Sequence, residues 1–286
     1  MAKQPEATPH GVDGEQRVTL SPFWAVWQPG LSSVLTAGPA RKAAANGAPI
    51  RTPVDGVAVV GVGGVLEKRE SFFSSGTSYL RIQQAMNAAL ADKSVEEIML
   101  LVSSPGGSVE GMAETGDLVR KARAQKRVTT FIDGMGASAA YYIGAQANEV
   151  VASRDATVGS IGIISYLYDM SAAFEKQGIK TVVIATGEAK ATGVPGTEVT
   201  KKQRADIQRM VDFHFKDFQE AVVQGRRMTP KAVEAVATGE VWPAPDAIKL
   251  NLVDRIATFD DTLAGLAAGV KAQARGRGRR ARFNAA

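Results

Sequence analysis

Ser138 is the residue of this chain whose surroundings best suit a nucleophile. It lies in the run Gly136-Ala137-Ser138-Ala139-Ala140, between an apolar stretch and an alanine-rich segment that favours a helix. The glycine permits a tight turn, and the small neighbours leave room for a substrate carbonyl. A helix that begins here points backbone N–H groups at the reacting atoms. A serine in this position can attack an acyl carbon, provided that a base accepts its proton.

The choice of base is narrow, because the chain has two histidines and no cysteine. His10 lies in a polar stretch that is typical of a disordered terminus. His214 is interpreted as a packed residue, because it shares one helix face with Ile207, Val211, Phe218 and Val222. A Ser-His-Asp triad is therefore not favoured, although a histidine at any sequence distance could reach the site. The alternative base is a lysine whose pKa is lowered from about 10.4 towards roughly 7–8.

Lys190 is the lysine whose surroundings differ from the rest. It follows the apolar, strand-like residues 181–184 and lies among small residues and glycines in 185–193. The other lysines lie mostly in polar, helix-like stretches that are typical of solvated surfaces. Spacing alone favours an ordinary exposed loop lysine over a catalytic base, so both interpretations stay open at this point.

Several motifs, taken together, resemble the S49 serine peptidases, the group similar to signal peptide peptidase A. Within that family the chain is similar to the phage branch called minor capsid protein C or head maturation protease. The resemblance covers about residues 54–256. It rests on Ser103-Ser104-Pro105-Gly106-Gly107, the Ser138 turn, Val158-Gly159-Ser160-Ile161-Gly162, Lys190 in a Gly-x-x-Lys context 52 residues after Ser138, and the closing segments 239–242 and 250–254.

The resemblance implies peptide-bond hydrolysis by a Ser-Lys dyad. Ser138 would be the nucleophile and Lys190 the base, and the backbone N–H groups of Gly107 and Ala139 would form the oxyanion hole. No metal and no cofactor is expected. Relatives assemble into rings whose active sites borrow residues between subunits, so a homo-oligomer is expected as well.

Supporting roles and departures concern five further positions. Gly106 would let the backbone approach a substrate closely, and Ser160 would hydrogen-bond the lysine, with a plain turn serine as the alternative.

The family usually has Gly-Gly after the nucleophile, where this chain has Ala139-Ala140; alanine is small and keeps its N–H. Glu240 replaces an arginine of the closing motif, which puts substrate preference in doubt. Asn251 replaces a glycine at a helix end, where asparagine tolerates a left-handed conformation.

The alternation of apolar runs with helix-like stretches predicts βαβ units. The resemblance implies the Clp protease/crotonase-like spiral, an α/β fold, with added C-terminal helices. We expect strands at 57–62, 98–102, 128–132, 149–152 and 181–184, and helices at 76–91, 108–125, 138–147 and 168–177. Thr200 and Gln203 predict a capping box that opens a long helix ending at Gly225, and Thr229-Pro230 opens another.

We expect three regions. Residues 1–52 form an N-terminal arm and linker with a short apolar segment, residues 23–27, which could pack on the body or on a neighbouring subunit. Residues 53–270 form the peptidase domain, and residues 271–286 a basic disordered tail. The tail holds six of the 34 basic residues and no acid, so the net charge of +5 belongs to the tail and the body is nearly neutral.

Composition limits the partners and the compartment. No apolar run reaches the roughly 18 residues that a membrane span needs, and no signal peptide is evident, so the host cytoplasm or a phage prohead is expected and a membrane partner is not. The substrate is expected to be a protein or peptide, with capsid scaffold and portal proteins as further partners. The basic tail could bind nucleic acid or an acidic partner.

Three other functions stay open beside the processing of head proteins during capsid assembly. They are a general cytoplasmic peptidase that clears peptides, a weakly active structural head component, and an acyl-CoA enzyme of the crotonase type. The Ser138 turn and Lys190 favour proteolysis over the last of these.

Overall fold

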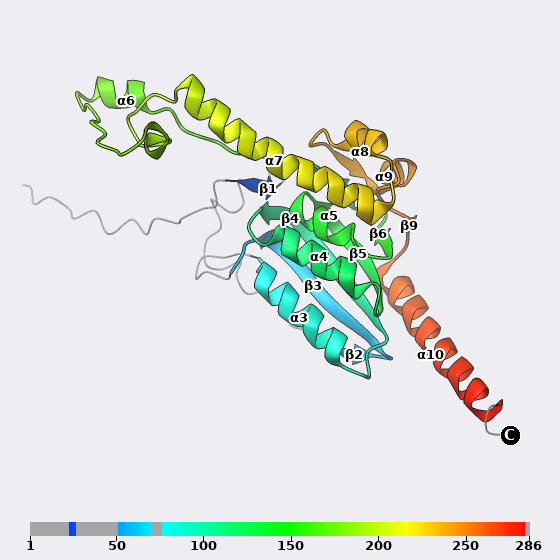
Figure 1. Ribbon diagram of the computed structural model, residues 1–286. Helices are drawn as coiled ribbons and strands as arrows, with labels where there is room; N and C mark the ends of the chain where they lie inside the picture. Colours follow the sequence, from blue (N-terminus) through cyan, green and yellow to red (C-terminus); the bar gives the residue numbers. More distant parts are fainter. Residues whose placement is uncertain (1–22, 27–50, 70–75, 284–286) are drawn as a thin grey trace, which may run out of the picture.

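The computed structural model describes residues 23–26, 51–69 and 76–283, and within them nine strands form one sheet (Figure 1). Five parallel strands make its centre, in the order β3 (Val57–Leu66), β4 (Glu97–Ser108), β5 (Arg127–Ala137), β6 (Glu149–Ala152) and β9 (Arg255–Ile256). Four shorter strands attach to these: β1 (Trp24–Val26) to β4, β2 (Arg51–Val54) to β3, β7 (Thr157–Gly159) to β5, and β8 (Val241–Pro243) to β7. Four of the five predicted strands are therefore confirmed.

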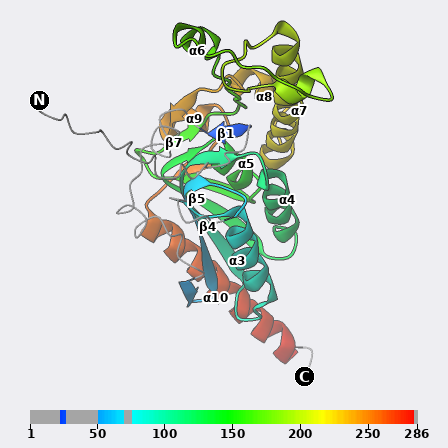
Figure 2. The ribbon, with the colours of Figure 1, turned by 90° about the vertical axis from the view of Figure 1, so that its left-hand side faces the viewer.

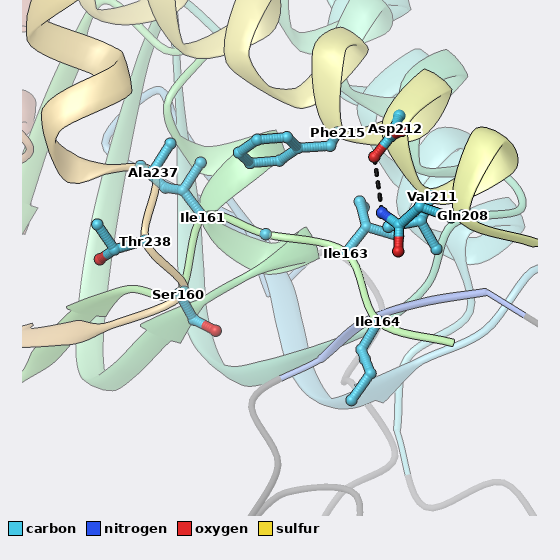
Figure 3. Close-up of a pocket in the computed structure, with 12 residues that line it drawn as sticks. Ser160, Ile161, Ile163, Ile164, Gln208, Val211, Asp212, Phe215, Ala237 and Thr238 are labelled. Atoms are coloured by element: carbon cyan, nitrogen blue, oxygen red, sulfur yellow. Dashed lines mark hydrogen bonds between the residues drawn. The ribbon is translucent and has the colours of Figure 1, made fainter. Parts of the chain in front are cut away.

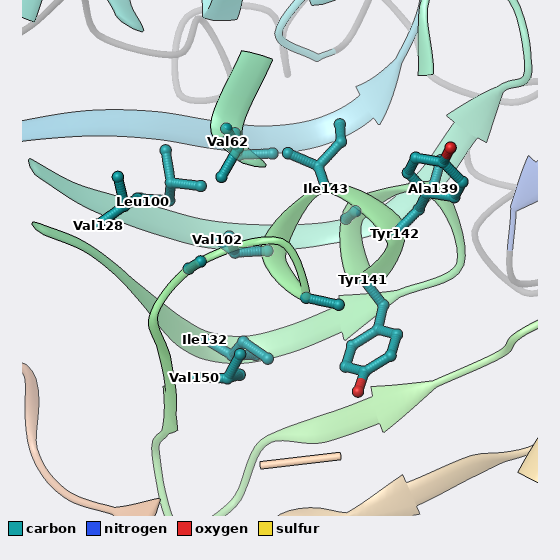
Figure 4. Packing of buried hydrophobic residues seen from close by; sticks show 14 of the residues in the cluster. Val62, Leu100, Val102, Val128, Ile132, Ala139, Tyr141, Tyr142, Ile143 and Val150 are labelled. Atoms are coloured by element: carbon teal, nitrogen blue, oxygen red, sulfur yellow. The ribbon is translucent and has the colours of Figure 1, made fainter. Parts of the chain in front are cut away.

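Helices cover both faces of the sheet, because the central strands are apolar on both sides. On β3, Ala58, Val60 and Val62 join the larger core cluster, which includes α3 (Tyr79–Ala91), α4 (Met112–Ala122) and α5 (Ala139–Gly144). The intervening Val57 and Val59 belong to a smaller cluster under α10 (Phe259–Phe283). Figure 2 shows α10 and the α3–α4 pair on opposite sides of the sheet, and Figure 4 shows valine, leucine and isoleucine side chains of the strands packed around Ile143 of α5.

The two predicted helix caps are confirmed, and one predicted helix end is wrong. Thr200 and Gln203 form the capping box of α7 (Lys201–Arg226), and Thr229 caps α8 (Pro230–Val236). A short α9 (Ala244–Lys249) follows. Gly225 does not end α7; Arg227 does, in a left-handed conformation with φ 54°. Gly225 stays helical because α7 packs there against α5, and a Cβ at this position would lie 2.4 Å from the carbonyl oxygen of Ala145.

The strand predicted at 181–184 is not formed. The chain from 165 to 200 makes an arm at the N-terminal end of α7, with only α6 (Ser171–Lys176) and the 3-10 turn η2 (Glu188–Ala191) as regular structure (Figure 1). Val182 is 74% exposed and Ile184 is 97% exposed. A β-branched run becomes a strand only when a sheet edge pairs with it, and none of the described segments offers one here.

The C-terminal end differs from the expectation of a disordered tail, because α10 continues through residues 271–283. Lys271 of this helix forms an ion pair with Asp55 in the turn between β2 and β3 (2.9 Å). The predicted arm 1–52 falls mostly outside the described residues. No helix in the described part of the chain is long and apolar enough to cross a membrane.

Candidate active site

Ser138 occupies a strained turn between β5 and α5. Its φ of 53° and ψ of −122° lie in a region that residues with a side chain rarely adopt. Two backbone hydrogen bonds hold this conformation: Ser138 N donates to the carbonyl of Gly159 (2.7 Å), and Tyr142 N donates to the carbonyl of Ser138 (2.8 Å). The residue is 1% exposed, and its Oγ has no hydrogen-bond partner among the described residues. A buried hydroxyl without a partner costs about 1–3 kcal/mol, so fold stability does not explain this serine.

Gly106 and Gly107 lie in the last residues of β4, next to the strand that ends before Ser138. Ser104 of β4 is paired with Gly136 of β5, so both strands continue side by side towards these residues. Gly106 has a φ of 103°, which favours glycine, and Ser104 Oγ fixes the bend by accepting from Gly106 N (3.1 Å) and donating to the carbonyl of Gly64 (2.6 Å). Gly107 admits no side chain, because a Cβ would lie 1.8 Å from the carbonyl oxygen of Leu66.

Ala139 supplies a second backbone N–H at this end of the sheet. It is the first residue of α5 and is fully buried. The first N–H groups of a helix have no acceptor within the helix. The structure therefore places the three predicted residues Ser138, Gly107 and Ala139 at the ends of two adjacent strands.

Ser160 lies beside this turn and borders a cavity. It follows Gly159, whose carbonyl accepts from Ser138 N, and its own N donates to the carbonyl of Glu240 (2.5 Å). The cavity of about 530 Å³ lies between residues 160–164, α7 and the loop before β8. Ile161 and Phe215 form apolar walls, and Gln208 and Asp212 are hydrogen-bonded to each other at one side (2.7 Å; Figure 3).

Helix α7 holds α5 by polar and aromatic contacts. Tyr142 Oη donates to Asp217 Oδ2 (3.0 Å), and its ring packs edge-on against Phe218 with centroids 5.2 Å apart. Gln146 Nε2 donates to the carbonyl of Ala221 (3.0 Å). Burial raises the pKa of Tyr142, and the nearby Asp217 raises it further, so the phenol stays protonated and donates. These contacts fix α5, whose N-terminal end carries Ser138.

An ion pair between the buried Arg226 and the partly exposed Asp254 ties the end of α7 to the closing motif. Arg226 donates to both carboxylate oxygens of Asp254 (2.8 and 2.7 Å) and to the carbonyl of Asn251 (3.0 Å). Burial works to raise the pKa of Asp254, but hydrogen bonds from Arg226 and from Val150 N outweigh it and lower the pKa. Tyr141 Oη of α5 donates to the carbonyl of Leu252 in the same motif (3.0 Å).

Lys190 is not brought to Ser138 within the chain. It lies in η2 with its backbone N donating to the carbonyl of Gly187 (3.0 Å), and its exposed ammonium group has no ion pair among the described residues. Glu188 of η2 pairs with Lys202 in the first turn of α7 (2.7 Å), whereas α5 contacts α7 from Asp217 onwards. At 1.5 Å per residue these two points of α7 are about 22 Å apart. Figure 1 shows the arm and α5 well separated along α7.

Sequence reasoning missed two features of the site. The α7 contacts join residues 75 positions apart, such as Tyr142 and Asp217, and no local pattern marks such a pair. Strand β1 pairs with Gly106–Ser108 of β4; the apolar run 23–27 indicated packing on the body or on a neighbouring subunit, but it did not indicate the position.

Comparisons with known proteins point to one family. The model of peptidase family S49 matches residues 120–273, more than half of the chain, and the Clp protease model matches residues 73–158. The latter match and the parallel sheet confirm the predicted α/β fold of the Clp protease type, with C-terminal helices.

Three relatives indicate the range of similar proteins. A protein of Methanocaldococcus jannaschii whose name assigns it to the proteases is 32% identical over 60% of this chain and 55% of its own. Protease 4 of Salmonella typhi is 30% identical over 75% of this chain and 35% of its own. Capsid assembly protease C of Escherichia phage lambda is 28% identical over 73% of this chain and 48% of its own. The chain thus spans about half, or less, of the length of these relatives.

Proposed function

Because this chain belongs to peptidase family S49, we propose that it is a serine peptidase that cleaves proteins internally with a Ser138–Lys190 dyad. The observation that carries this proposal is Ser138 itself. It is held in a strained turn, it is buried, and its Oγ has no partner among the described residues. Strain and an unpaired polar atom at one residue are typical of a functional position.

The reaction would proceed by acyl transfer. Ser138 Oγ bonds to the peptide carbonyl carbon while its proton passes to the neutral amine of Lys190. The N–H groups of Gly107 and Ala139 stabilise the oxyanion. The C–N bond then breaks as the lysine returns the proton to the leaving amine, and water, deprotonated by the same lysine, releases the acyl group from the serine.

The lysine would come from a neighbouring subunit. Lys190 and Ser138 are separated along α7 in one chain, and the arm that carries Lys190 is exposed over most of its length. Docking of this arm on a second copy would bury its apolar residues Val182 and Ile184. It would also supply a lysine whose pKa falls when water is excluded. A homo-oligomer is therefore part of the proposal.

The biological role proposed is the processing of scaffold or other head proteins during phage capsid assembly, in the host cytoplasm or the prohead. The similarity to capsid assembly protease C of phage lambda supports it. Scaffold and portal proteins are the partners that this role implies. A general peptidase is the alternative that the similarity to protease 4 favours.

Intact-mass analysis of an unfolded test protein, incubated with the oligomer, tests the dyad. The wild type should produce fragments, and Ser138→Ala and Lys190→Ala should produce none. Lys180→Ala is the matched control, because it removes another exposed lysine of the same arm and should leave cleavage intact.

Mixing the two inactive variants tests where the lysine comes from. If each site combines Ser138 of one subunit with Lys190 of another, re-assembled mixtures of Ser138→Ala and Lys190→Ala contain some complete sites and regain activity. A mixture that exchanges subunits and stays inactive would contradict the shared dyad. Fragments from Lys190→Ala alone would exclude Lys190 as the base.

A further inference from the structure

Strand β1 lies where the sheet is open beside Ser138. It pairs antiparallel with the end of β4, with Trp24 opposite Ser108, Ala25 opposite Gly107, and Val26 opposite Gly106. The other edge of β4 is taken at this point by β3, since Leu66 pairs with Gly107. β1 therefore fills the edge that β5 leaves when it ends at Ala137, and Figures 1 and 2 both show β1 beside α5.

In this register, Ala25 of β1 lies opposite the backbone of Gly107. Val109 N donates to the carbonyl of Phe23 (3.2 Å), which makes these two residues a hydrogen-bonded pair of the antiparallel ladder. Hydrogen-bonded pairs alternate along such a ladder, so the next one joins Gly107 and Ala25. The N–H of Gly107, the proposed oxyanion donor, then faces the carbonyl of Ala25.

A side-chain contact holds the start of this segment. The ring of Phe23 is partly buried and lies 5.5 Å from the ring of His214 on α7 (centroid to centroid). His214, which the sequence offered as a packed residue, thus contacts the N-terminal segment. The segment 23–26 is fixed by α7 at one side and by β4 at the other.

We propose that residues 23–26 are an internal occupant of the substrate position, and that they must leave β4 before a peptide can bind. An extended peptide that adds to the same edge would pair with Gly106–Ser108 in the same way. The two cannot be present together, because one edge of β4 accepts one strand. This inference rests on the proposed function, since it takes Gly107 as a donor to the substrate carbonyl.

The occupant lowers the apparent affinity for a peptide by the fraction of molecules in which the edge is free. Ala25→Pro removes the N–H that faces Gly107 and disfavours pairing with β4. Ala25→Ser keeps the N–H and is the matched control. Phe23→Ala is a second variant, which removes the contact with His214 and leaves the backbone of β1 unchanged.

Peptide binding gives a test that needs no catalysis. Each variant is combined with Ser138→Ala in the full chain, and a fluorescein-labelled peptide with the sequence of residues 20–30 is titrated by fluorescence anisotropy. We expect Ala25→Pro to bind the peptide about tenfold more tightly than Ala25→Ser, with Phe23→Ala between them. Equal affinity in all three, or no binding to any of them, would overturn the proposal.

Cleavage of the unfolded test protein separates this inference from the proposed function. With Ser138 intact, Ala25→Pro should lower KM several-fold and leave kcat unchanged. If Ala25→Pro binds the peptide more tightly and cleaves nothing, the peptidase mechanism is wrong, whereas the inference that residues 23–26 occupy the substrate position still holds. If all variants cleave with the same KM, the inference that residues 23–26 occupy the substrate position is wrong, whereas the peptidase mechanism still holds.

Discussion

Gly225→Ala tests how closely α7 must approach α5. Gly225 lies inside a 26-residue helix, where alanine is normally about 1 kcal/mol more stable than glycine. A Cβ here, however, would lie 2.4 Å from the carbonyl oxygen of Ala145 and 2.8 Å from Nε2 of Gln146. The nearer atom is backbone, so one helix must shift, and such overpacking costs typically about 1–3 kcal/mol, from which the propensity gain of about 1 kcal/mol is subtracted.

The matched control is Gly265→Ala on α10. Gly265 is also inside a helix, but it is exposed and a Cβ there would have no neighbour within 4 Å. We expect this variant to be more stable by up to about 1 kcal/mol and Gly225→Ala to be less stable by up to about 2 kcal/mol. Urea denaturation followed by circular dichroism measures both, and cleavage by Gly225→Ala should also fall because Ser138 is attached to α5.

The sign of the difference in stability between the two variants tests whether α5 and α7 lie in close contact. If Gly225→Ala is as stabilising as Gly265→Ala, the two helices do not touch as closely as the structure has them. The proposed link between α7 and the Ser138 turn would then be refuted as well.

Three further predictions concern polar groups. Ser138→Ala should leave stability unchanged or raise it, because it removes an unpaired buried hydroxyl, and Ser138→Gly should be about 1 kcal/mol more stable than Ser138→Ala, because glycine accepts a φ of 53°. Thermal denaturation of both variants gives the order, and a glycine variant less stable than the alanine variant would contradict backbone strain at this position. Asp254→Ala should lower the free energy of unfolding by about 3 kcal/mol and Arg226→Ala by about 2 kcal/mol, because the arginine left unpaired is 6% exposed whereas the aspartate left unpaired is 41% exposed. Equal losses in urea denaturation would show that burial of the remaining charge does not determine the loss. Glu97→Gln should raise Tm near pH 7 and have little effect near pH 4, because burial raises the pKa of Glu97 and its ionised form is therefore the costly one; a Tm gain that does not depend on pH would exclude this cause.

Local signals predicted the elements that local chemistry determines. The capping box at Thr200, the Thr229-Pro230 start and the buried strands all depend on residues a few positions apart. The turn at Ser138 was predicted in the same way, because Gly136 permits a tight turn and the small residues on both sides of the serine leave room for a substrate. Gly107 and Ala139 followed from the family resemblance; Gly107 lies near the end of β4, and Ala139 follows Ser138 directly as the first residue of α5.

The features that the sequence did not predict depend on packing between distant segments. Gly225 looked like a helix end because glycine commonly stops helices, but its lack of a side chain serves the contact with Ala145. Residues 181–184 have strand propensity, yet a strand needs an edge to pair with. Whether Lys190 reaches a Ser138 depends on the assembly, which is not a property of one chain, so the dyad itself stays a prediction.

The long helix α7 behaves mechanically as a lever. Its fixed part is the contact with α5 around Asp217, and its free end carries the arm about 22 Å away. A tilt of about 5° at the fixed part moves the arm by about 2 Å, and a displacement of about 1 Å at a reacting group can cost a hundredfold in rate. Small changes in how tightly α5 and α7 pack are therefore amplified at the far end, where Lys190 is carried.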